Sequence, residues 1–82
     1  MSNLALAALE PRQQAVVTAL DLEFAVRERL AALGMRIGRK LQVVRRVGVL
    51  GPMQVRIDHT DLILRTAEAG RIQVRLLPED QP

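Results

Sequence analysis

The stretch from Arg29 to Gly38 constrains the fold most strongly, because the spacing of apolar residues changes there from helical to extended. Before the change, four apolar residues recur at the spacing that lines one face of an α-helix: Leu22, Val26, Leu30 and Leu33. After it, apolar and polar residues alternate as they do in a strand. Gly34 can adopt the positive φ that ends a helix, so we predict a helix over residues 22–33.

Five short strands are predicted from β-branched residues and from alternating apolar and polar side chains. They span residues 14–20, 40–47, 53–57, 62–65 and 72–76. In the second of them, Leu41, Val43 and Val47 are expected to face the core, opposite Lys40, Gln42 and Arg46. We also expect Asp21 to cap the helix at its N-terminus, residues 58–61 to form a tight turn, and residues 66–71 to form one helical turn.

This order of elements indicates a mainly β protein with a short helix. Five strands in so short a chain can protect their edges by curling into a small barrel, and a helix between strands 1 and 2 can close one end. We therefore expect a small SH3-like β-barrel of five strands. A five-stranded OB-type barrel is the alternative, although its helix normally lies between the third and fourth strands.

The length of 82 residues allows one domain, with an expected core over about residues 9–77 and a frayed tail at 78–82. The apolar run Leu4–Leu9 lacks the basic segment that precedes a signal sequence, and it is far shorter than the roughly twenty residues that cross a bilayer. We therefore expect a cytoplasmic protein with no anchor of its own.

Basic residues are concentrated in one part of the chain. The net charge is +3, but the segment from Arg29 to Ile57 holds seven basic residues and no acidic one. Such a patch can attract nucleic acid, an anionic lipid surface or an acidic protein. We do not expect nucleic acid, because single-strand binding usually relies on several exposed aromatic side chains and Phe24 is the only aromatic residue.

The residue types exclude most catalytic chemistry. The chain has no cysteine and a single histidine, so a Cys–His pair is impossible, and the one serine, Ser2, lies at the terminus. The glycines at 34 and 38 are not followed by the lysine or the third glycine of a phosphate-binding loop. We expect neither an enzyme nor a bound cofactor.

Three potential metal ligands lie close together in the sequence: Asp58, His59 and Asp61. Side chains alternate in direction along a hairpin, so the three are not expected to point at one ion, and aspartate is a common turn residue. We favour a turn here, with a transient surface site for a divalent transition metal as the weaker interpretation.

The helix, the corner and the strands that follow resemble the FeoA family, which comprises small cytoplasmic proteins of bacterial ferrous-iron uptake. The resemblance covers about residues 9–77. It depends on an ordered set of residues: Arg29, Leu30, Leu33, Gly34, Met35, Gly38, Val43, Arg46, Gly51, Pro52, Val55, Arg56, Ile57, Leu62, Leu64, Arg65, Glu68, Ala69, Ile72 and Val74. The sequence departs from the family pattern at Ile37, where proline is common, and at Arg12 and the Asp58–His59 turn, where glycine is common.

The resemblance implies an SH3-like barrel that works beside FeoB, the membrane ferrous-iron transporter with a cytoplasmic G-protein domain. It implies an accessory role at the inner face of the cytoplasmic membrane. The related barrel at the C-terminus of iron-dependent repressors shares the pattern, so an SH3-like regulatory or nucleic-acid-binding module is the alternative function.

We predict that the protein docks on its partner through a surface made by the corner and by the loop after residue 48. Five residues are candidates for it: Met35, Arg36, Ile37, Val49 and Leu50. Loops often carry function, and exposed apolar clusters often mark contact sites. Leu33 is expected in the core. Association of the chain with itself is a further alternative.

Overall fold

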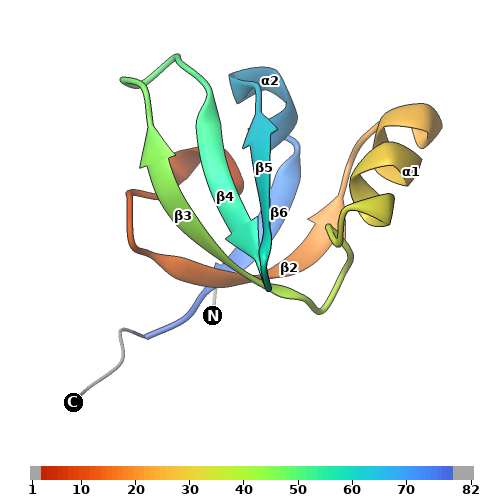
Figure 1. Ribbon diagram of the computed structural model, residues 1–82, viewed down its shortest axis with the longest axis horizontal. Coiled ribbons are helices and arrows are strands. Elements are labelled where there is room, and N and C mark those ends of the chain that lie inside the picture. The colour runs from red at the N-terminus through yellow and green to blue at the C-terminus, as the bar shows by residue number, and fades with distance from the viewer. Residues whose placement is uncertain (1–2, 79–82) are drawn as a thin grey trace.

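Strands make up most of the regular secondary structure, as the alternating sequence predicts. The computed structural model describes residues 3–78 and is shown in Figure 1. Its elements are β1 (Leu4–Ala5), the 3₁₀ helix η1 (Leu6–Ala8), β2 (Gln14–Leu20), α1 (Phe24–Ala32), β3 (Lys40–Arg46), β4 (Met53–Ile57), β5 (Thr60–Leu64), α2 (Thr66–Ala69) and β6 (Ile72–Leu76). The predicted fold class, mainly β with a short helix, is confirmed.

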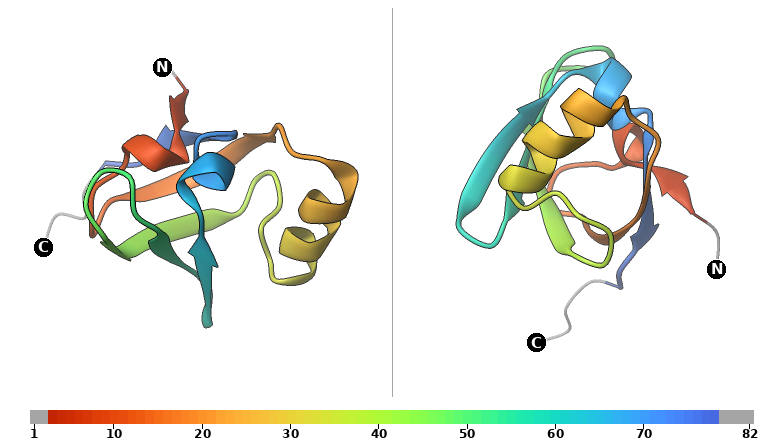
Figure 2. Two further views of the ribbon diagram at one scale, coloured as in Figure 1. Left: turned by 90° about the horizontal axis from the view of Figure 1, so that it is seen from above. Right: turned by 90° about the vertical axis from the view of Figure 1, so that its right-hand side faces the viewer.

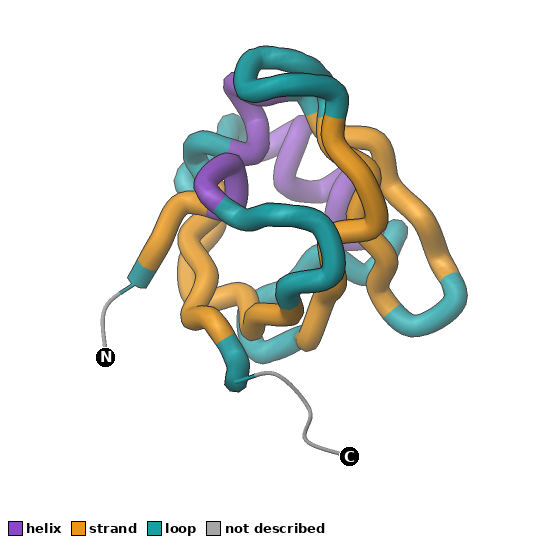
Figure 3. The backbone as a smooth tube through the Cα atoms, turned by 90° about the vertical axis from the view of Figure 1, so that its left-hand side faces the viewer, coloured by secondary structure: helices purple, strands orange, loops and turns teal. Residues whose placement is uncertain are grey.

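The strands form one antiparallel sheet in the order β1-β6-β2-β3-β4-β5. It curves strongly, as Figures 2 and 3 show, but within residues 3–78 its two edge strands, β1 and β5, do not pair with each other. The prediction of a closed, five-stranded barrel is therefore wrong. The sheet has six strands and is open, and α1 follows the second strand instead of lying between strands 1 and 2.

The additional strand comes from the apolar run near the N-terminus. Leu4 and Ala5 pair with Val74 and Gln73 of β6. Two residues are too few to show an alternating pattern, which is why the sequence did not reveal β1. The chain then turns into η1, so β1 covers the edge of β6 without reaching β5.

The core lies inside the curve of the sheet. Strand residues that face inward supply most of it: Ala15, Val17, Leu41, Val43, Met53, Val55, Ile57, Leu62, Leu64, Ile72 and Val74. Leu6 and Leu9 also join the core, from the segment before β2, and Met35 joins it from the corner. The core therefore extends to residues N-terminal of the predicted strands.

The helix α1 is shorter than predicted. It begins at Phe24, and its N-cap residue is Glu23, which makes no capping side-chain hydrogen bond. The prediction that Asp21 caps the helix is wrong, because Asp21 pairs instead with Arg71 of the β6 side. The predicted end is confirmed: Gly34 has a φ of 105°, and its N–H donates to the carbonyl of Ala31 over 3.0 Å.

Leu30 is the buried residue of α1. Val26, which also packs against the core, is only partly buried. Leu33 is 45% exposed, so the prediction that it belongs to the core is wrong. The helix has ended before Leu33, and Met35, two residues later, enters the core instead. The helix stands beside the sheet, as Figure 1 and the left view of Figure 2 show.

A β-bulge reverses the facing of residues near the end of β3. The pairing with β4 shifts between Val43 and Arg45. Because an extra residue changes which face later side chains occupy, Arg46 turns inward and Val47 outward. The prediction that Val47 faces the core, opposite Arg46, is therefore wrong: Val47 is exposed, whereas Arg46 is partly buried.

Among residues 3–78, two non-glycine residues have positive φ, Arg12 at 80° and Asp58 at 56°. These are the positions at which the sequence departs from a family pattern with glycine. Left-handed backbone costs a residue with a Cβ about 1–2 kcal/mol. Both positions therefore hold local backbone strain.

Within residues 3–78, no helix combines the length and the apolar character needed to cross a membrane. Of the predicted tail, residues 79–82 lie outside the described part of the chain.

Candidate protein-interaction site

The β3–β4 loop (residues 47–52) exposes three aliphatic side chains. Val49 and Leu50 are 79% and 84% exposed, and Val47 is exposed beside them. Exposed apolar side chains that lie together are typical of contact sites. The loop lies at the upper left of Figure 1.

Hydrogen bonds hold the backbone of this loop. The N–H of Val47 donates to the carbonyl of Pro52 over 3.1 Å and closes the loop at its base. The Thr66 hydroxyl of α2 lies 2.7 Å from the carbonyl oxygen of Leu50 and 3.0 Å from that of Gly51. A Cβ at Gly51 would lie only 1.9 Å from the carbonyl oxygen of Val47, so this close approach requires glycine.

Arg46 connects the loop to the N-terminal segment. Its Nη1 donates to the carbonyl oxygens of Ala7 and Leu9 over 2.9 and 2.5 Å. Its Nε and Nη2 reach the carbonyl oxygens of Gly48 and Val49 over 3.2 and 3.3 Å. The planar guanidinium, with its five N–H groups, suits such a position between two segments. The loop backbone is therefore fixed while its aliphatic side chains point to solvent.

A shallow hollow extends this surface toward β5. It has a volume of about 240 Å³, and its lining includes Val47, Pro52 and Ile63. Ile63 pairs with Gln54 across β4 and β5, and its side chain is 67% exposed. The aliphatic surface thus continues from the β3–β4 loop onto the outer side of the edge strand.

The corner between α1 and β3 differs from its prediction at one residue. Met35 has no exposed surface, and its N–H donates to the carbonyl of Leu30 over 3.0 Å. The chain turns back toward the sheet at Gly34, which carries the Met35 side chain into the core. The prediction of Met35 as a contact residue is therefore wrong. Arg36 and Ile37 are both exposed.

The corner and the loop do not form one surface. They precede and follow β3, whose seven residues span about 20 Å. Figure 1 shows the corner at the lower right, below α1, and the loop at the opposite end of β3. The prediction that they act together is therefore wrong. Arg36 and Ile37 lie at one end of the molecule, and Val49 and Leu50 at the other.

The candidate metal ligands lie at the β4–β5 turn, with their carboxylates in ion pairs. Asp58 pairs with Arg39, and both are exposed enough to contact solvent. Asp61 accepts hydrogen bonds from Arg56 over 2.6 and 3.0 Å, and one from Gln54 over 2.9 Å. Among the described residues, no three histidine, aspartate or glutamate side chains gather as a set of metal ligands.

The Arg56–Asp61 contact changes the proton affinity of both groups. The side-chain hydrogen bond with Arg56 is the main reason that the pKa of Asp61 is lowered from its ordinary value. The same hydrogen bond raises the pKa of Arg56. Both groups are therefore held in their charged forms.

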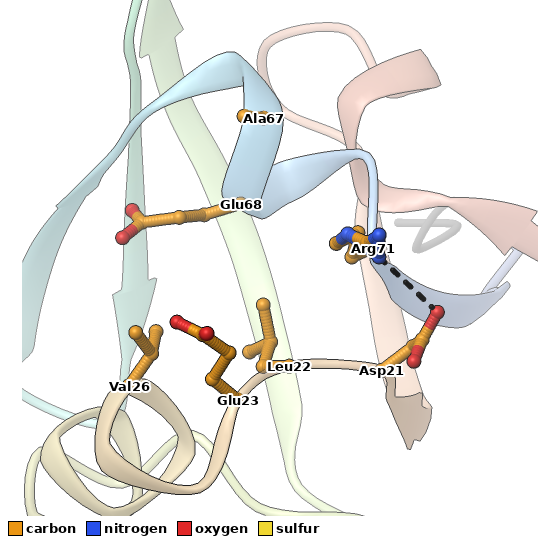
Figure 4. A pocket seen from close by; sticks show the side chains of 7 residues that line it. All are labelled: Asp21, Leu22, Glu23, Val26, Ala67, Glu68 and Arg71. Atoms are coloured by element: carbon orange, nitrogen blue, oxygen red, sulfur yellow. Dashed lines mark ion pairs between the residues drawn. The ribbon is translucent and has the colours of Figure 1, made fainter.

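Another hollow, of about 560 Å³, separates α1 from α2 (Figure 4). Asp21 and Arg71 form an ion pair at one side of it, with 3.7 Å between Oδ2 and Nη1. Glu68 pairs with Arg29 at 3.0 Å. The lining has only aliphatic and charged side chains, without a histidine or hydroxyl group, so it offers no Ser–His pair.

Four residues of the loop surface were not predicted as functional: Arg46, Val47, Ile63 and Thr66. The β3 bulge concealed the first two, because alternation in the sequence assigned them to the wrong faces. Ile63 was assigned only to a strand. For Thr66, the one available signal was that a residue with a hydroxyl group stands at the start of the predicted turn at 66–71.

Solved structures confirm the fold. The solution structure of a FeoA protein from Chlorobium tepidum is 36% identical, with a TM-score of 0.86 over 95% of this chain and 74% of that chain. FeoA of Stenotrophomonas maltophilia, complexed with zinc and described as a prokaryotic SH3 domain protein, is 33% identical, with a TM-score of 0.74 over 87% and 88% of the two chains.

A manganese-dependent transcriptional repressor shares the fold alone. It is 23% identical, with a TM-score of 0.83, and the match covers 94% of this chain but 38% of the repressor. No curated protein matches this sequence.

The family model for the FeoA domain matches residues 4–76, which is nearly the whole chain. This match agrees with the SH3-like fold and with the similarity to the two FeoA structures above. The chain therefore belongs to the FeoA family, which is associated with ferrous-iron transport.

Proposed function

We propose that this chain is a cytoplasmic accessory protein of ferrous-iron uptake that docks on a FeoB-type membrane transporter through the β3–β4 loop. One observation carries the proposal: Val49 and Leu50 are almost fully exposed on a loop whose backbone is held by Arg46 and Thr66. Membership of the FeoA family supports a role in ferrous-iron uptake, and the exposed side chains of the β3–β4 loop support this loop as the docking surface.

A fixed loop favours binding because less conformational entropy is lost when a partner orders it. Burying a large aliphatic side chain contributes about 1.5–3 kcal/mol, so two such residues can dominate a small interface. Arg45 lines the hollow beside the loop, and the loop itself has no acidic residue. We therefore expect an acidic rim on the partner and binding that weakens as salt concentration rises.

The other predicted sites have separate roles in this proposal. Arg36 and Ile37 offer a second, smaller contact at the opposite end of β3, for the partner or for another copy of the chain. The Asp58–His59 turn and Asp61 offer at most a transient divalent-metal contact. A zinc titration of His59→Ala tests that contact, and unchanged affinity would remove it.

The experiment that tests the docking proposal measures binding of the purified chain to a FeoB-type transporter in detergent. We expect the double variant Val49→Ser/Leu50→Ser to bind about tenfold more weakly or worse, with an unchanged circular dichroism spectrum. Phe24→Ser is the matched control, because Phe24 is an exposed apolar residue of α1. Undiminished binding of the double variant would refute the loop as the docking surface.

The similarity in fold to a repressor supports a second candidate, a regulatory module that binds DNA with the basic segment. A gel shift at low salt distinguishes the two functions, since phosphate contacts are strongest there. Absence of a shift at low salt excludes the regulatory module.

A further inference from the structure

The strand β5 has a free edge. Among the strands of the described part of the chain it is the last in the sheet order, and β4 is its sole neighbour. Proteins usually protect such an edge with a very short strand, a lysine, a proline or a bulge. The other edge strand, β1, has only two residues, whereas β5 has five, without lysine or proline and without a register shift against β4.

The pairing register shows which backbone groups face outward. Ile57 pairs with Thr60 across the two-residue turn, and Val55 pairs with Leu62. The pair that closes such a turn is hydrogen-bonded, and bonded pairs alternate with non-bonded pairs along an antiparallel ladder. Asp61 and Ile63 therefore direct their N–H and C=O groups away from β4. Within residues 3–78, no backbone hydrogen bond from another segment reaches these groups.

The free edge borders a groove. The groove has a volume of about 590 Å³ and lies between β5 and α1. Val26, Leu30 and Leu33 line the helix side, and Leu62 and Ile63 line the strand side. Figure 1 shows α1 on the side of β5 that is away from β4. A chain lying along the free edge would therefore have an apolar wall on its other side.

Among the described residues, three of the four charged side chains that line the groove form ion pairs. Arg29 pairs with Glu68, and Asp61 pairs with Arg56. Arg65 follows the last residue of β5, lines the groove, is exposed and forms no ion pair with any described residue. The guanidinium of Arg65 is therefore available to pair with an anionic group at the C-terminal end of β5.

We infer that β5 and α1 form a docking groove for an extended segment of a partner protein, which adds to the sheet as a seventh strand. The free N–H and C=O groups of Asp61 and Ile63 specify an extended backbone. The apolar walls specify aliphatic side chains at alternate positions, and Arg65 specifies a carboxylate. An antiparallel segment would place that carboxylate at its N-terminal end.

This groove shares Ile63 with the hollow beside the β3–β4 loop but does not include Val49 or Leu50, and its test does not need the transporter. The probe is a capped synthetic peptide of alternating valine and threonine, with one glutamate at its N-terminal end. Added to ¹⁵N-labelled protein, it should slow hydrogen exchange at the amides of Asp61 and Ile63. Exchange at Leu62 and Leu64 should not change, because their amides already bond to β4.

Two controls separate strand addition from other contacts. The same peptide with N-methyl groups on the residues that face β5 keeps its side chains but loses its donors, and should bind about fivefold more weakly or worse. In the protein, Leu33→Glu should weaken binding, whereas Phe24→Glu should not, because Phe24 is exposed on α1 but does not line the groove.

The inference is overturned if exchange at Asp61 and Ile63 stays unchanged at saturating peptide, or if the N-methylated peptide binds as tightly as the original. Equal binding by the Leu33→Glu and Phe24→Glu variants would also overturn it. The Val49→Ser/Leu50→Ser variant should bind the peptide normally. Failure of loop docking and failure of this groove are therefore separate results.

Discussion

The side-chain hydroxyl of Thr66 lies 2.7 Å from the carbonyl oxygen of Leu50 and ties α2 to the β3–β4 loop. Replacing Thr66 by valine keeps the shape of the side chain but removes this hydrogen bond. We expect Thr66→Val to lower the free energy of unfolding by about 1 kcal/mol, which urea denaturation measures. We also expect lower NMR order parameters at the amides of Val49 and Leu50.

Thr66→Ser is the control for this prediction, because it keeps the hydroxyl and should restore the order parameters. If the loop is equally ordered in Thr66→Val, the hydroxyl does not hold it. That result would not refute docking through the loop, because the side chains of Val49 and Leu50 would still be present to contact a partner.

Arg46 should matter more than its neighbour Arg45. Lysine at position 46 keeps the charge, but one ammonium group cannot reach the carbonyl oxygens of both Leu9 and Val49. Partly buried carbonyl groups then lose their donors, so we expect Arg46→Lys to lower the free energy of unfolding by about 2 kcal/mol. Thermal and urea unfolding measure the change.

Arg45→Lys is the matched control, because Arg45 is exposed and its side chain makes no hydrogen bond with any described residue. We expect a change within about 0.5 kcal/mol for that variant. Equal effects of the two substitutions would show that Arg46 contributes through its charge and not through its contacts with the two segments.

Features that depend on neighbouring residues could be predicted from the sequence, whereas features that depend on distant segments could not. β-Branched residues located β2, alternation located β4 and β6, and Gly34 located the end of α1, because each signal lies within a few residues of its effect. The closure of a sheet depends instead on whether two distant edges meet. The sequence of β5 carries no information about β1, which has only two residues and does not pair with β5.

The candidate site was harder to predict because it depends on a bulge. The run Val43-Val44-Arg45-Arg46 breaks the alternation where the bulge occurs. The prediction continued one alternating pattern through that break, so it assigned Arg46 and Val47 to the wrong faces. Burial of Met35 was likewise not predicted, since it follows from the direction in which the chain leaves Gly34. Val49 and Leu50 were found because they are apolar residues between glycines in a loop.

The positive φ of Arg12 predicts a stabilising substitution. Its N–H donates to the carbonyl of Val43 over 2.8 Å, and its own carbonyl accepts from Gln42, which together hold the backbone in this conformation. Glycine removes the strain but also increases the entropy of the unfolded chain. We expect Arg12→Gly to raise the free energy of unfolding by a net amount of about 0.5–1 kcal/mol.

Arg12→Ala separates the backbone from the side chain, because alanine keeps the Cβ and its strain. It should not stabilise the protein, as judged by urea unfolding under the same conditions. Stabilisation by alanine as large as that by glycine would assign the effect to the removed arginine side chain.

The Arg56–Asp61 contact predicts how stability depends on pH. Hydrogen bonding to Arg56 lowers the pKa of Asp61 in the folded state, while in the unfolded chain the carboxyl has its ordinary pKa of about 3.9. The unfolded state therefore takes up the proton first as pH falls. The stabilisation from this contact is fully present above the unfolded pKa and is lost as pH falls through the folded pKa.

We expect Asp61→Asn to be less stable than the native sequence at pH 7, with the difference shrinking as pH falls below about 4. Urea unfolding at a series of pH values from 7 to about 2 measures this. Arg56→Met removes the partner and should show the same convergence with the native sequence. If the stability difference between Asp61→Asn and the native sequence is the same at every pH, the ion pair does not stabilise the fold.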